Sequence, residues 1–202
     1  MSESVIFLLG STGYVGSQFL IILGRALPHL PVRVLVRSLT AERETWLHQV
    51  HPNLTTVEGT LEDESILQDQ AENADIVINL ASCDHLVTAE GEHSVHSYHL
   101  TRLTLRSCNE AILSGMRKRS VNKPSDPPFL LHVSGTGILS DNARGEARDA
   151  KVYSDLDLDL ELYGPSTSLV FFYSRTLSLP KDNPHVEIDL AVGRVSQMTS
   201  YK

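Results

Sequence analysis

Val5-Ile6-Phe7-Leu8-Leu9-Gly10-Ser11-Thr12-Gly13-Tyr14-Val15-Gly16 is an apolar run that ends in three regularly spaced glycines. It passes directly into the apolar-rich segment 17–23, so the pattern predicts a strand, a tight turn and a helix. A glycine permits the sharp turn, another lets the backbone approach a pyrophosphate, and the last lets the helix lie close to the sheet. We therefore predict that residues 10–16 bind a dinucleotide, with the first-turn amides of the helix facing its phosphates.

The spacing of these glycines is G-x-x-G-x-x-G, which differs by one residue from the commoner dinucleotide fingerprint. The alternative interpretation is an ordinary glycine-rich turn between a strand and a helix. The context favours the dinucleotide site, because the motif follows five apolar residues, opens an amphipathic helix and precedes a second predicted strand.

Composition limits the classes of protein to which the chain can belong. Its 202 residues fit one domain, and 41% apolar and 21% charged residues are ordinary for a globular protein. The net charge of -8 argues against nucleic acid or an anionic membrane as the main partner. Cys83 and Cys108 form no C-x-x-C motif, no signal peptide is recognisable, and no apolar run approaches the ~20 residues of a membrane span. We expect a cytoplasmic protein.

Further strands alternate with helices along the chain. Strands are predicted at 32–36, 54–59, 74–81 and 129–135, with helices at 41–50 and 61–70. The first four strands start 22 to 27 residues apart, whereas the last two start 53 residues apart, so something extra lies between strands four and five. The fold class is α/β: a doubly wound parallel sheet, a Rossmann fold, with its ligand at the carboxyl ends of the strands.

Four segments together resemble a known superfamily: Gly10 to Gly16, Val36-Arg37-Ser38, Val77-Ile78-Asn79-Leu80-Ala81 and His132-Val133-Ser134-Gly135-Thr136-Gly137. They are similar to the extended and atypical short-chain dehydrogenase/reductases, in particular the epimerase-like or NmrA-like NAD(P)-binding proteins of fungi. The resemblance covers about residues 1–150, the expected NAD(P)-binding domain. Residues 151–202 look like an irregular tail, a remnant of the substrate-binding part, so the chain looks truncated or mis-spliced after strand five.

The same fold predicts which strand ends line the cofactor. Asn79, Leu80 and Ala81 are expected to pass under the ribose, and Ser134 to approach the nicotinamide. Glu62 or Asp63, just past strand three, is expected near the adenine.

Arg37 and Ser38 stand where strand two ends, the position that usually carries Asp or Glu in an NAD site. A guanidinium suits a phosphate and a carboxylate repels one, so we expect NADP(H) to be favoured over NAD(H). The alternative is an arginine on an exposed turn.

The catalytic pair that the resemblance implies is missing. In this superfamily a Tyr, with a Lys four residues later, exchanges a proton with the substrate, and a Ser or Thr after strand five binds the substrate oxygen. Ser134 and Thr136 stand at the hydroxyl position, but the chain contains no Tyr-x-x-x-Lys. Tyr163 is a weak candidate, as is Tyr153, since both lack the lysine, and surface-packed aromatic residues are the alternative.

Other segments depart from the family pattern. His93, His96 and His99 invite a metal site, but their spacing spreads them over more than one helix face and we predict none. Removing 91–109 would restore a normal interval between strands, and 162–174 and 192–202 look equally out of place. We hypothesise that these three stretches are translated introns, which cDNA from the locus would test. The acidic alternation 155–161 is expected to be an edge strand or a loop rather than a cation site.

These observations lead to one main expectation and two alternatives. The first is an NADPH-linked oxidoreductase or epimerase acting on a small organic substrate. The second is a non-catalytic NADP-binding regulator with a protein partner, as the NmrA-like resemblance implies. The third is an inactive, truncated chain. The missing Tyr/Lys pair favours the last two.

Overall fold

The computed structural model describes residues 4–81 and 95–133 of the chain, with side chains left out of the description between 95 and 107. Within these residues one parallel sheet has the strand order β3-β2-β1-β4-β5. The strands are β1 (Ile6–Leu9), β2 (Val32–Val36), β3 (Leu54–Glu58), β4 (Ile76–Asn79) and β5 (Phe129–His132). The helices are α1 (Tyr14–Ala26), α2 (Ala41–Val50), α3 (Glu64–Glu72) and α4 (Val95–Asn122).

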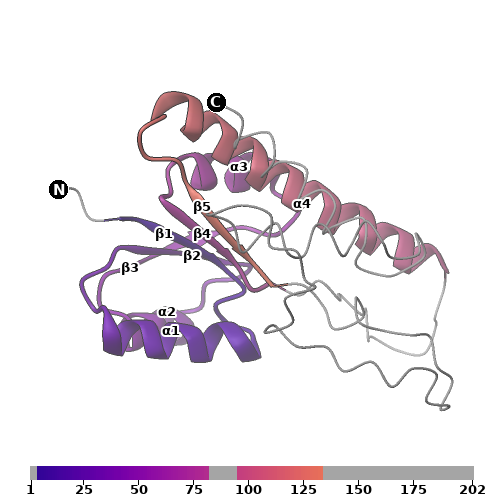
Figure 1. The fold of residues 1–202 in the computed structure, drawn as a ribbon. Helices are drawn as coiled ribbons and strands as arrows, with labels where there is room; N and C mark the ends of the chain where they lie inside the picture. The colour runs from indigo at the N-terminus through magenta and orange to yellow at the C-terminus, as the bar shows by residue number, and fades with distance from the viewer. Residues whose placement is uncertain (1–3, 82–94, 134–202) are drawn as a thin grey trace, which may run out of the picture. The chain divides into compact units, whose positions relative to one another are not determined.

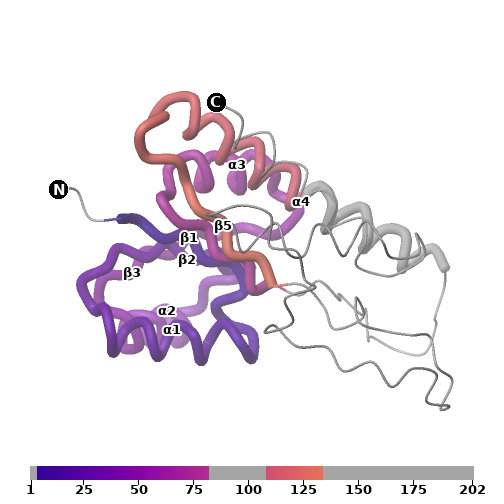
Figure 2. Tube along the Cα trace, viewed as in Figure 1, coloured from indigo at the N-terminus to yellow at the C-terminus, as the bar shows by residue number. Residues whose placement is uncertain are grey.

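The helices cover the sheet on both faces. Figure 1 shows α1 and α2 together on one face and α3 and α4 on the other, and the Cα trace in Figure 2 shows the same two layers. The strand order places β1 in the centre, where it pairs with β2 on one side and β4 on the other. All four residues of β1 are buried, as expected for a strand covered on both faces. The carboxyl end of β1, which leads into the glycine turn, therefore lies in the middle of the sheet edge.

The core beneath α1 and α2 consists of apolar side chains from four strands and the two helices. Its buried members are Ile6, Leu8, Leu20, Leu23, Val32, Val34, Val36, Leu47, Leu54 and Ile78. This cluster packs α1 and α2 against the sheet.

On the other face α4 packs closely on α3 and is held by a buried ion pair. A Cβ at Gly115 would overlap the backbone oxygen of Gln68, so only glycine allows this approach of the two helices. Arg119 on α4 is buried and pairs with Asp75 at the start of β4, and the other carboxylate oxygen of Asp75 accepts a hydrogen bond of 2.6 Å from the amide of Val5. α4 is thereby fixed to the amino ends of β1 and β4.

The predicted fold class and the five strands are confirmed, with strand starts within one residue of the sequence interpretation for β1 and at the expected residue for β2, β3 and β5. The third helix starts at Glu64 rather than Leu61. The reason is that residues 60–63 form a turn, described below, which delays the helix.

The hypothesised foreign stretch 91–109 is partly described by the structure, and its origin stays a hypothesis. α4 runs without interruption from Val95 to Asn122, and Cys108 and Asn109 are buried in it. Two residues at that end therefore belong to the core. Segments 162–174 and 192–202 lie outside the described residues, as do His93, Ser134, Thr136, Tyr153, Tyr163 and the acidic alternation 155–161.

The chain divides into two units, Met1–Val133 and Ser134–Lys202. The predicted domain boundary at residue 150 falls in the second unit, outside the described residues, and stays a prediction. None of the described helices combines the length and apolar character needed to cross a lipid bilayer.

Candidate dinucleotide site

The glycine turn between β1 and α1 is the first part of the site, and two of its glycines are required by the protein itself. Gly10 has a φ of +80°, in the region that disfavours side chains, and a Cβ there would come within 2.5 Å of the Ala81 nitrogen and the Leu80 carbonyl carbon. A Cβ at Gly16 would overlap the carbonyl oxygen of Gly10. The first glycine thus permits the turn against the end of β4, and the third permits α1 to start directly on that turn.

Gly13 differs from these two because the protein does not demand it. Its φ is −79°, which any residue adopts, and among the described residues a Cβ there would meet only the Gly10 oxygen, at 3.3 Å. Gly13 is the N-cap residue of α1, and its amide donates to the Gly10 oxygen at 3.0 Å. The space that a side chain at Gly13 would fill lies beside the first turn of the helix, where a ligand would approach.

The start of α1 has the properties of an anion site. Gly13 provides no side-chain cap and the first turn contains no acidic residue. The positive end of the helix dipole and the first-turn amides therefore remain available for a phosphate. Tyr14 and Val15 are 91% and 55% exposed at this point, so the helix start is open to a ligand.

Ser11 lies inside the turn, and its hydroxyl indicates whether the turn suits a phosphate. The residue is fully buried, and its oxygen has no hydrogen-bond partner in the part of the chain that the structure describes. A buried hydroxyl without a partner costs free energy, about 1–3 kcal/mol. A phosphate oxygen seated on the turn could supply that partner, so the turn fits a dinucleotide pyrophosphate.

The end of β2 carries the basic residues of the site. Arg37 and Ser38 are exposed immediately after Val36. A guanidinium nitrogen of Arg43, in the first turn of α2, donates to the Ser38 carbonyl oxygen. The structure thereby brings a second arginine to the turn that carries Arg37. The sequence pattern alone does not single out Arg43, although a cation in the first turn of a helix opposes the helix dipole, which is a signal that the residue has another role.

The end of β3 forms a turn held by Asp63. One carboxylate oxygen of Asp63 accepts hydrogen bonds from the Thr60 amide at 2.6 Å and from the Thr60 hydroxyl at 2.9 Å. These bonds, the backbone one first, lower the pKa of Asp63 below its usual value. The carboxylate is thus already used to shape the turn, and Glu62 beside it is exposed. The predicted proximity of either residue to adenine stays a prediction.

At the end of β4 the three predicted residues have different roles. Asn79 is buried, and its side chain is bonded to protein groups, including the Ala81 amide at 3.1 Å. The backbone of Leu80 and Ala81 lies against Gly10. The structure therefore brings the Leu80–Ala81 turn and the glycine turn together at one edge of the sheet. The predicted place of these residues under the ribose stays a prediction.

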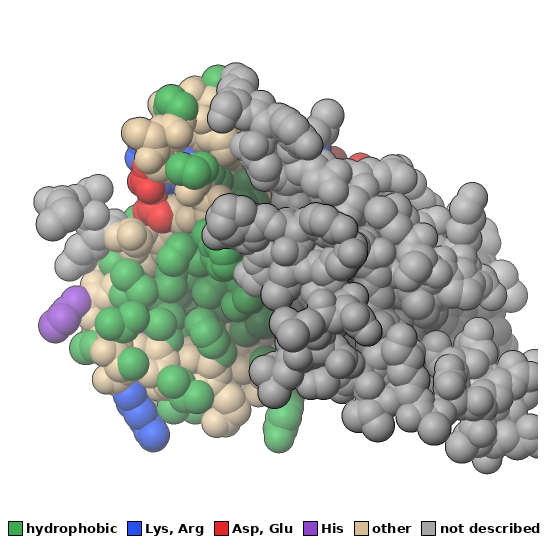
Figure 3. All heavy atoms as spheres, in the orientation of Figure 1, with side chains coloured by type: hydrophobic (Ala, Val, Ile, Leu, Met, Phe, Trp, Pro, Cys, Tyr) green, Lys and Arg blue, Asp and Glu red, His purple; other side chains and the backbone are tan. Residues whose placement is uncertain are grey.

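The end of β5 presents apolar side chains. Phe129 and Leu131 on β5, and Val133 directly after it, are at alternate positions and are all exposed. The space-filling view shows hydrophobic side chains gathered on the face where β5 lies in front (Figure 3). Ser134, predicted to approach the nicotinamide, follows directly but lies outside the described residues.

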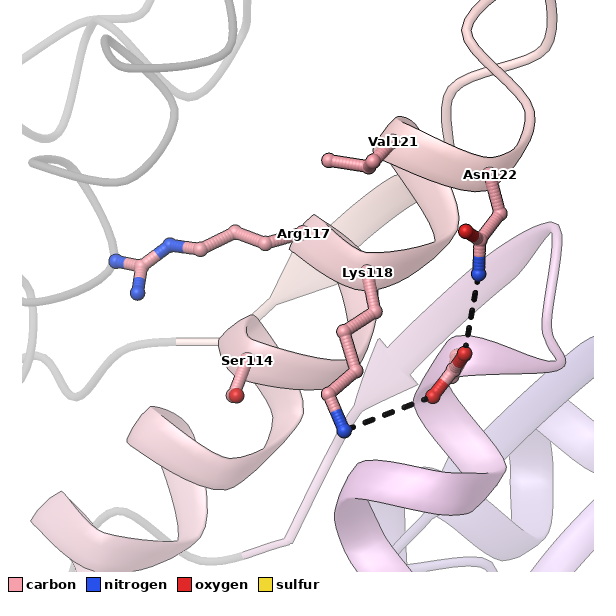
Figure 4. Close-up of a pocket in the computed structure, with 6 residues that line it drawn as sticks. Ser114, Arg117, Lys118, Val121 and Asn122 are labelled. Atoms are coloured by element: carbon pink, nitrogen blue, oxygen red, sulfur yellow. Dashed lines mark hydrogen bonds and ion pairs between the residues drawn. The ribbon is translucent and has the colours of Figure 1, made fainter.

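A groove of about 470 Å³ lies elsewhere, between α3 and α4. Glu72 on α3 pairs with Lys118 at 3.9 Å and accepts from the Asn122 amide nitrogen at 3.3 Å, as Figure 4 shows, while Arg117 points away. The remaining lining residues are Ser114 and Val121. The groove is lined by the C-terminal part of α4 and the end of α3, so it is separate from the strand-end site. Among the described residues no group of three or more His, Cys, Asp or Glu could hold a metal ion.

Comparison with known proteins supports the fold. No protein-family model matches the chain. Over 157 residues it is 34% identical to oxidase ucsJ of an Acremonium species, covering 75% of this chain and 38% of that protein. The chain thus spans little more than a third of the length of this curated relative.

Three solved structures resemble the chain at low sequence identity. The terminal R domain from the myxalamid PKS-NRPS biosynthetic pathway has a TM-score of 0.58 at 16% identity, over 99% of this chain and 46% of that one. WbmH of Bordetella bronchiseptica, in complex with NAD+, has a TM-score of 0.52 at 16% identity, and the match covers 98% of this chain and 53% of that one. Carbonyl reductase Sniffer of D. melanogaster has a TM-score of 0.50 at 13% identity, and the match covers 71% of this chain and 66% of that one. At these identities the likeness establishes the fold alone.

Proposed function

We propose that this chain, which has the fold of the extended short-chain dehydrogenase/reductases, binds a nicotinamide dinucleotide at the carboxyl edge of its sheet. The observation that carries the proposal is the start of α1: an uncapped helix N-terminus without acidic residues, next to a buried Ser11 hydroxyl that has no partner in the described part of the chain. The residues proposed to hold the pyrophosphate are Gly10, Ser11, Thr12, Gly13, Tyr14, Val15 and Gly16, chiefly through their backbone amides.

The proposed cofactor is NADP(H) rather than NAD(H). Arg37 follows β2 directly, and the guanidinium of Arg43, in the first turn of α2, donates to the carbonyl of the neighbouring Ser38. Arginine offers forked donors that match a 2′-phosphate, and a charge-assisted hydrogen bond contributes about 1.5–3 kcal/mol. Glu58 on β3 is the register partner of Val36, the residue before Arg37. It is therefore an acidic residue near the proposed phosphate site, and its effect on the cofactor preference needs a control.

Titration of the purified full chain with NADPH and NADH tests this preference. NADPH should bind more tightly by roughly tenfold or more, which corresponds to about 1.4 kcal/mol. Arg37→Ala should erase most of the difference while leaving NADH binding nearly unchanged. Glu58→Gln is the matched charge control and should preserve or increase the preference.

Equal affinity for the two cofactors in the unmodified protein would contradict the NADP(H) assignment but not the dinucleotide site. Failure to bind either cofactor would contradict the whole proposal.

The proposed chemistry is oxidoreduction of a small organic substrate. A bound nicotinamide would supply or accept a hydride at the substrate carbon. Ser134 and Thr136 would orient the substrate oxygen by hydrogen bonding, by the resemblance drawn from the sequence. The curated relative is named an oxidase, which agrees with this class of reaction. Turnover of NADPH with a panel of carbonyl compounds is the direct measurement.

The absence of Tyr-x-x-x-Lys from the sequence favours a second candidate, a regulator that binds NADP(H) without catalysis. This candidate predicts tight cofactor binding with no turnover against any substrate, together with a protein partner whose affinity changes between NADP+ and NADPH. Turnover at a useful rate would remove it.

A further inference from the structure

Asn79, at the carboxyl end of β4, joins parts of the fold that are far apart in sequence. It is 4% exposed. Its amide nitrogen donates to Asn109 Oδ1 on α4 at 3.2 Å and lies 3.4 Å from His132 Nδ1 on β5. Its oxygen accepts from the Ala81 amide at 3.1 Å. One side chain thus connects α4, β5 and the turn that follows β4.

The link to Ala81 reaches the glycine turn. A Cβ at Gly10 would lie 2.5 Å from the Ala81 nitrogen, so the Leu80–Ala81 backbone is the surface on which the glycine turn is seated. Leu80 also donates its amide to the Leu9 oxygen at 3.1 Å, which continues the ladder between β4 and β1. By holding the Ala81 amide, the Asn79 oxygen fixes the position of this surface.

The two hydrogens of the Asn79 amide are both accounted for by its neighbours. One is directed to Asn109 Oδ1, and the other can be accepted by His132 only if Nδ1 of that imidazole carries a lone pair. With its oxygen used by Ala81, the Asn79 side chain is committed to protein groups rather than to a ligand.

We propose that Asn79 is a positioning residue for dinucleotide binding: it holds the Leu80–Ala81 turn, and through it Gly10, in the geometry that accepts the pyrophosphate. The proposal rests on the proposed function. A turn that is ordered before binding spares the ligand the entropy cost of ordering it. Loss of Asn79 should therefore weaken the affinity for the cofactor without removing any atom that contacts it.

Three variants of the full chain test this role. Asn79→Leu has similar shape but removes all three contacts. Asn109→Leu removes the link from Asn79 to α4 and keeps the contact between Asn79 and Ala81. Val77→Ala is the matched control, because Val77 is fully buried on the same strand, two residues from Asn79, and has no part in the cluster. The readouts are NADPH and NADH affinity under conditions where each variant is folded, and hydrogen exchange of the Ala81 and Gly10 amides.

Asn79→Leu should lower the affinity for both cofactors about tenfold, equivalent to ~1.4 kcal/mol, and speed hydrogen exchange of the Ala81 amide. Asn109→Leu should lower the two affinities less. The double variant should bind the cofactors as tightly as Asn79→Leu alone, because both substitutions act through one linkage. Val77→Ala should lower the free energy of unfolding but leave both affinities unchanged. If the role of Asn79 were purely structural, Asn79→Leu would likewise lower the free energy of unfolding and leave both affinities unchanged.

Unchanged affinity in folded Asn79→Leu, with normal binding by the unmodified chain, would overturn the positioning role and leave the proposed function intact. If the unmodified chain binds no dinucleotide, the proposed function fails. In that case an unchanged rate of Ala81 amide exchange in Asn79→Leu would also show that Asn79 does not hold the Leu80–Ala81 turn. Should Asn79→Leu not fold, the smaller substitution Asn79→Ala, which also removes all three contacts, decides: unchanged affinity in it would again overturn the proposal.

Discussion

The first turns of α1 and α2 are built in opposite ways. In α2 the Thr40 hydroxyl oxygen accepts a hydrogen bond of 3.2 Å from the Arg43 amide, and Glu42 and Glu44 lie in the first turn. In α1 the N-cap is Gly13, which offers no side chain, and the first turn has no acidic residue. One helix start is satisfied by its own residues, and the other is left for a partner.

This difference indicates which of the two helix starts at the carboxyl edge of the sheet suits a pyrophosphate. Both helices follow strands of the same parallel sheet, so both present positive dipole ends at its carboxyl edge. Capping and acidic residues neutralise that end in α2, so the 2′-phosphate proposed near Arg37 and Arg43 would depend on their guanidinium groups and not on the dipole of α2. Only the α1 end combines free donors with an approach open at Gly13. Each experiment below changes one side of this comparison.

The largest effect is expected at Gly10, where the α1 turn is formed. Gly10→Ala should lower the free energy of unfolding by about 2–4 kcal/mol, because it adds left-handed strain and a Cβ that overlaps the Leu80–Ala81 backbone. Urea denaturation measures this loss. Gly13→Ala is the matched control, three residues away with φ in the ordinary range, and should cost under about 1 kcal/mol. Equal losses in the two variants would show that the turn tolerates a side chain at Gly10.

The next effect separates binding from stability at Gly13. Gly13→Val should fill the space where the pyrophosphate approaches and lower dinucleotide affinity more than tenfold, about 1.4 kcal/mol, with only a small change in unfolding free energy. Isothermal titration with NADPH and NADH on the folded variant gives the result. Full affinity in Gly13→Val would show that the start of α1 is not the anion site, despite its lack of a cap.

Sequence predicted the α1 side of this comparison well, since strand, turn and helix occupy one continuous stretch in which glycine spacing and apolar residues carry the information. The same holds for the strands, whose buried apolar runs stand out. The start of α3 was placed three residues early because the Asp63 carboxylate, bonded to Thr60, holds a turn that propensity does not reveal.

Long-range polar contacts could not be predicted. Asn79 meets Asn109 and His132 across 30 and 53 residues of sequence. Such contacts depend on the packed geometry of several elements, which no local pattern encodes. The contact of Arg43 with the Ser38 carbonyl is local, but it depends on how the turn between β2 and α2 is folded.

The α2 side of the comparison is tested by removing its cap. Thr40→Val keeps the shape of the side chain but loses the hydrogen bond to the Arg43 amide, so the free energy of unfolding should fall by about 1 kcal/mol. NADH affinity should stay unchanged, since the cap serves α2 alone. Urea denaturation measures the free energy of unfolding, and titration with NADH measures the affinity. A clear loss of NADH affinity would mean that the start of α2 also takes part in binding.

The smallest effect concerns the other end of α2, where His51 is the C-cap residue. Its amide donates to the Leu47 oxygen at 2.9 Å, its side chain is fully buried, and its ring nitrogens have no hydrogen-bond partner within the part of the chain described. Burial lowers the pKa of His51 below its usual value, opposed in part by the backbone carbonyls of Leu27 and of His51 itself. A cation is normally favoured at a helix C-terminus, but here desolvation of the ring outweighs that benefit.

The direction of the pH dependence follows from this lowered pKa. Between the folded value and about 6.5, the value of an unperturbed histidine, the unfolded chain binds more protons than the folded one. The stabilisation is therefore complete above about pH 6.5 and decreases as the pH falls through that window. Urea denaturation at pH 5.5 and 7.5 measures it in the unmodified chain. His51→Leu, an apolar residue in an apolar site, should reduce the difference between the two pH values, whereas His48→Gln, exposed on the same helix, should preserve it. If His51→Leu kept the full pH dependence, the proton would be taken up elsewhere, and the neutral state of His51 would have no part in the stability of α2.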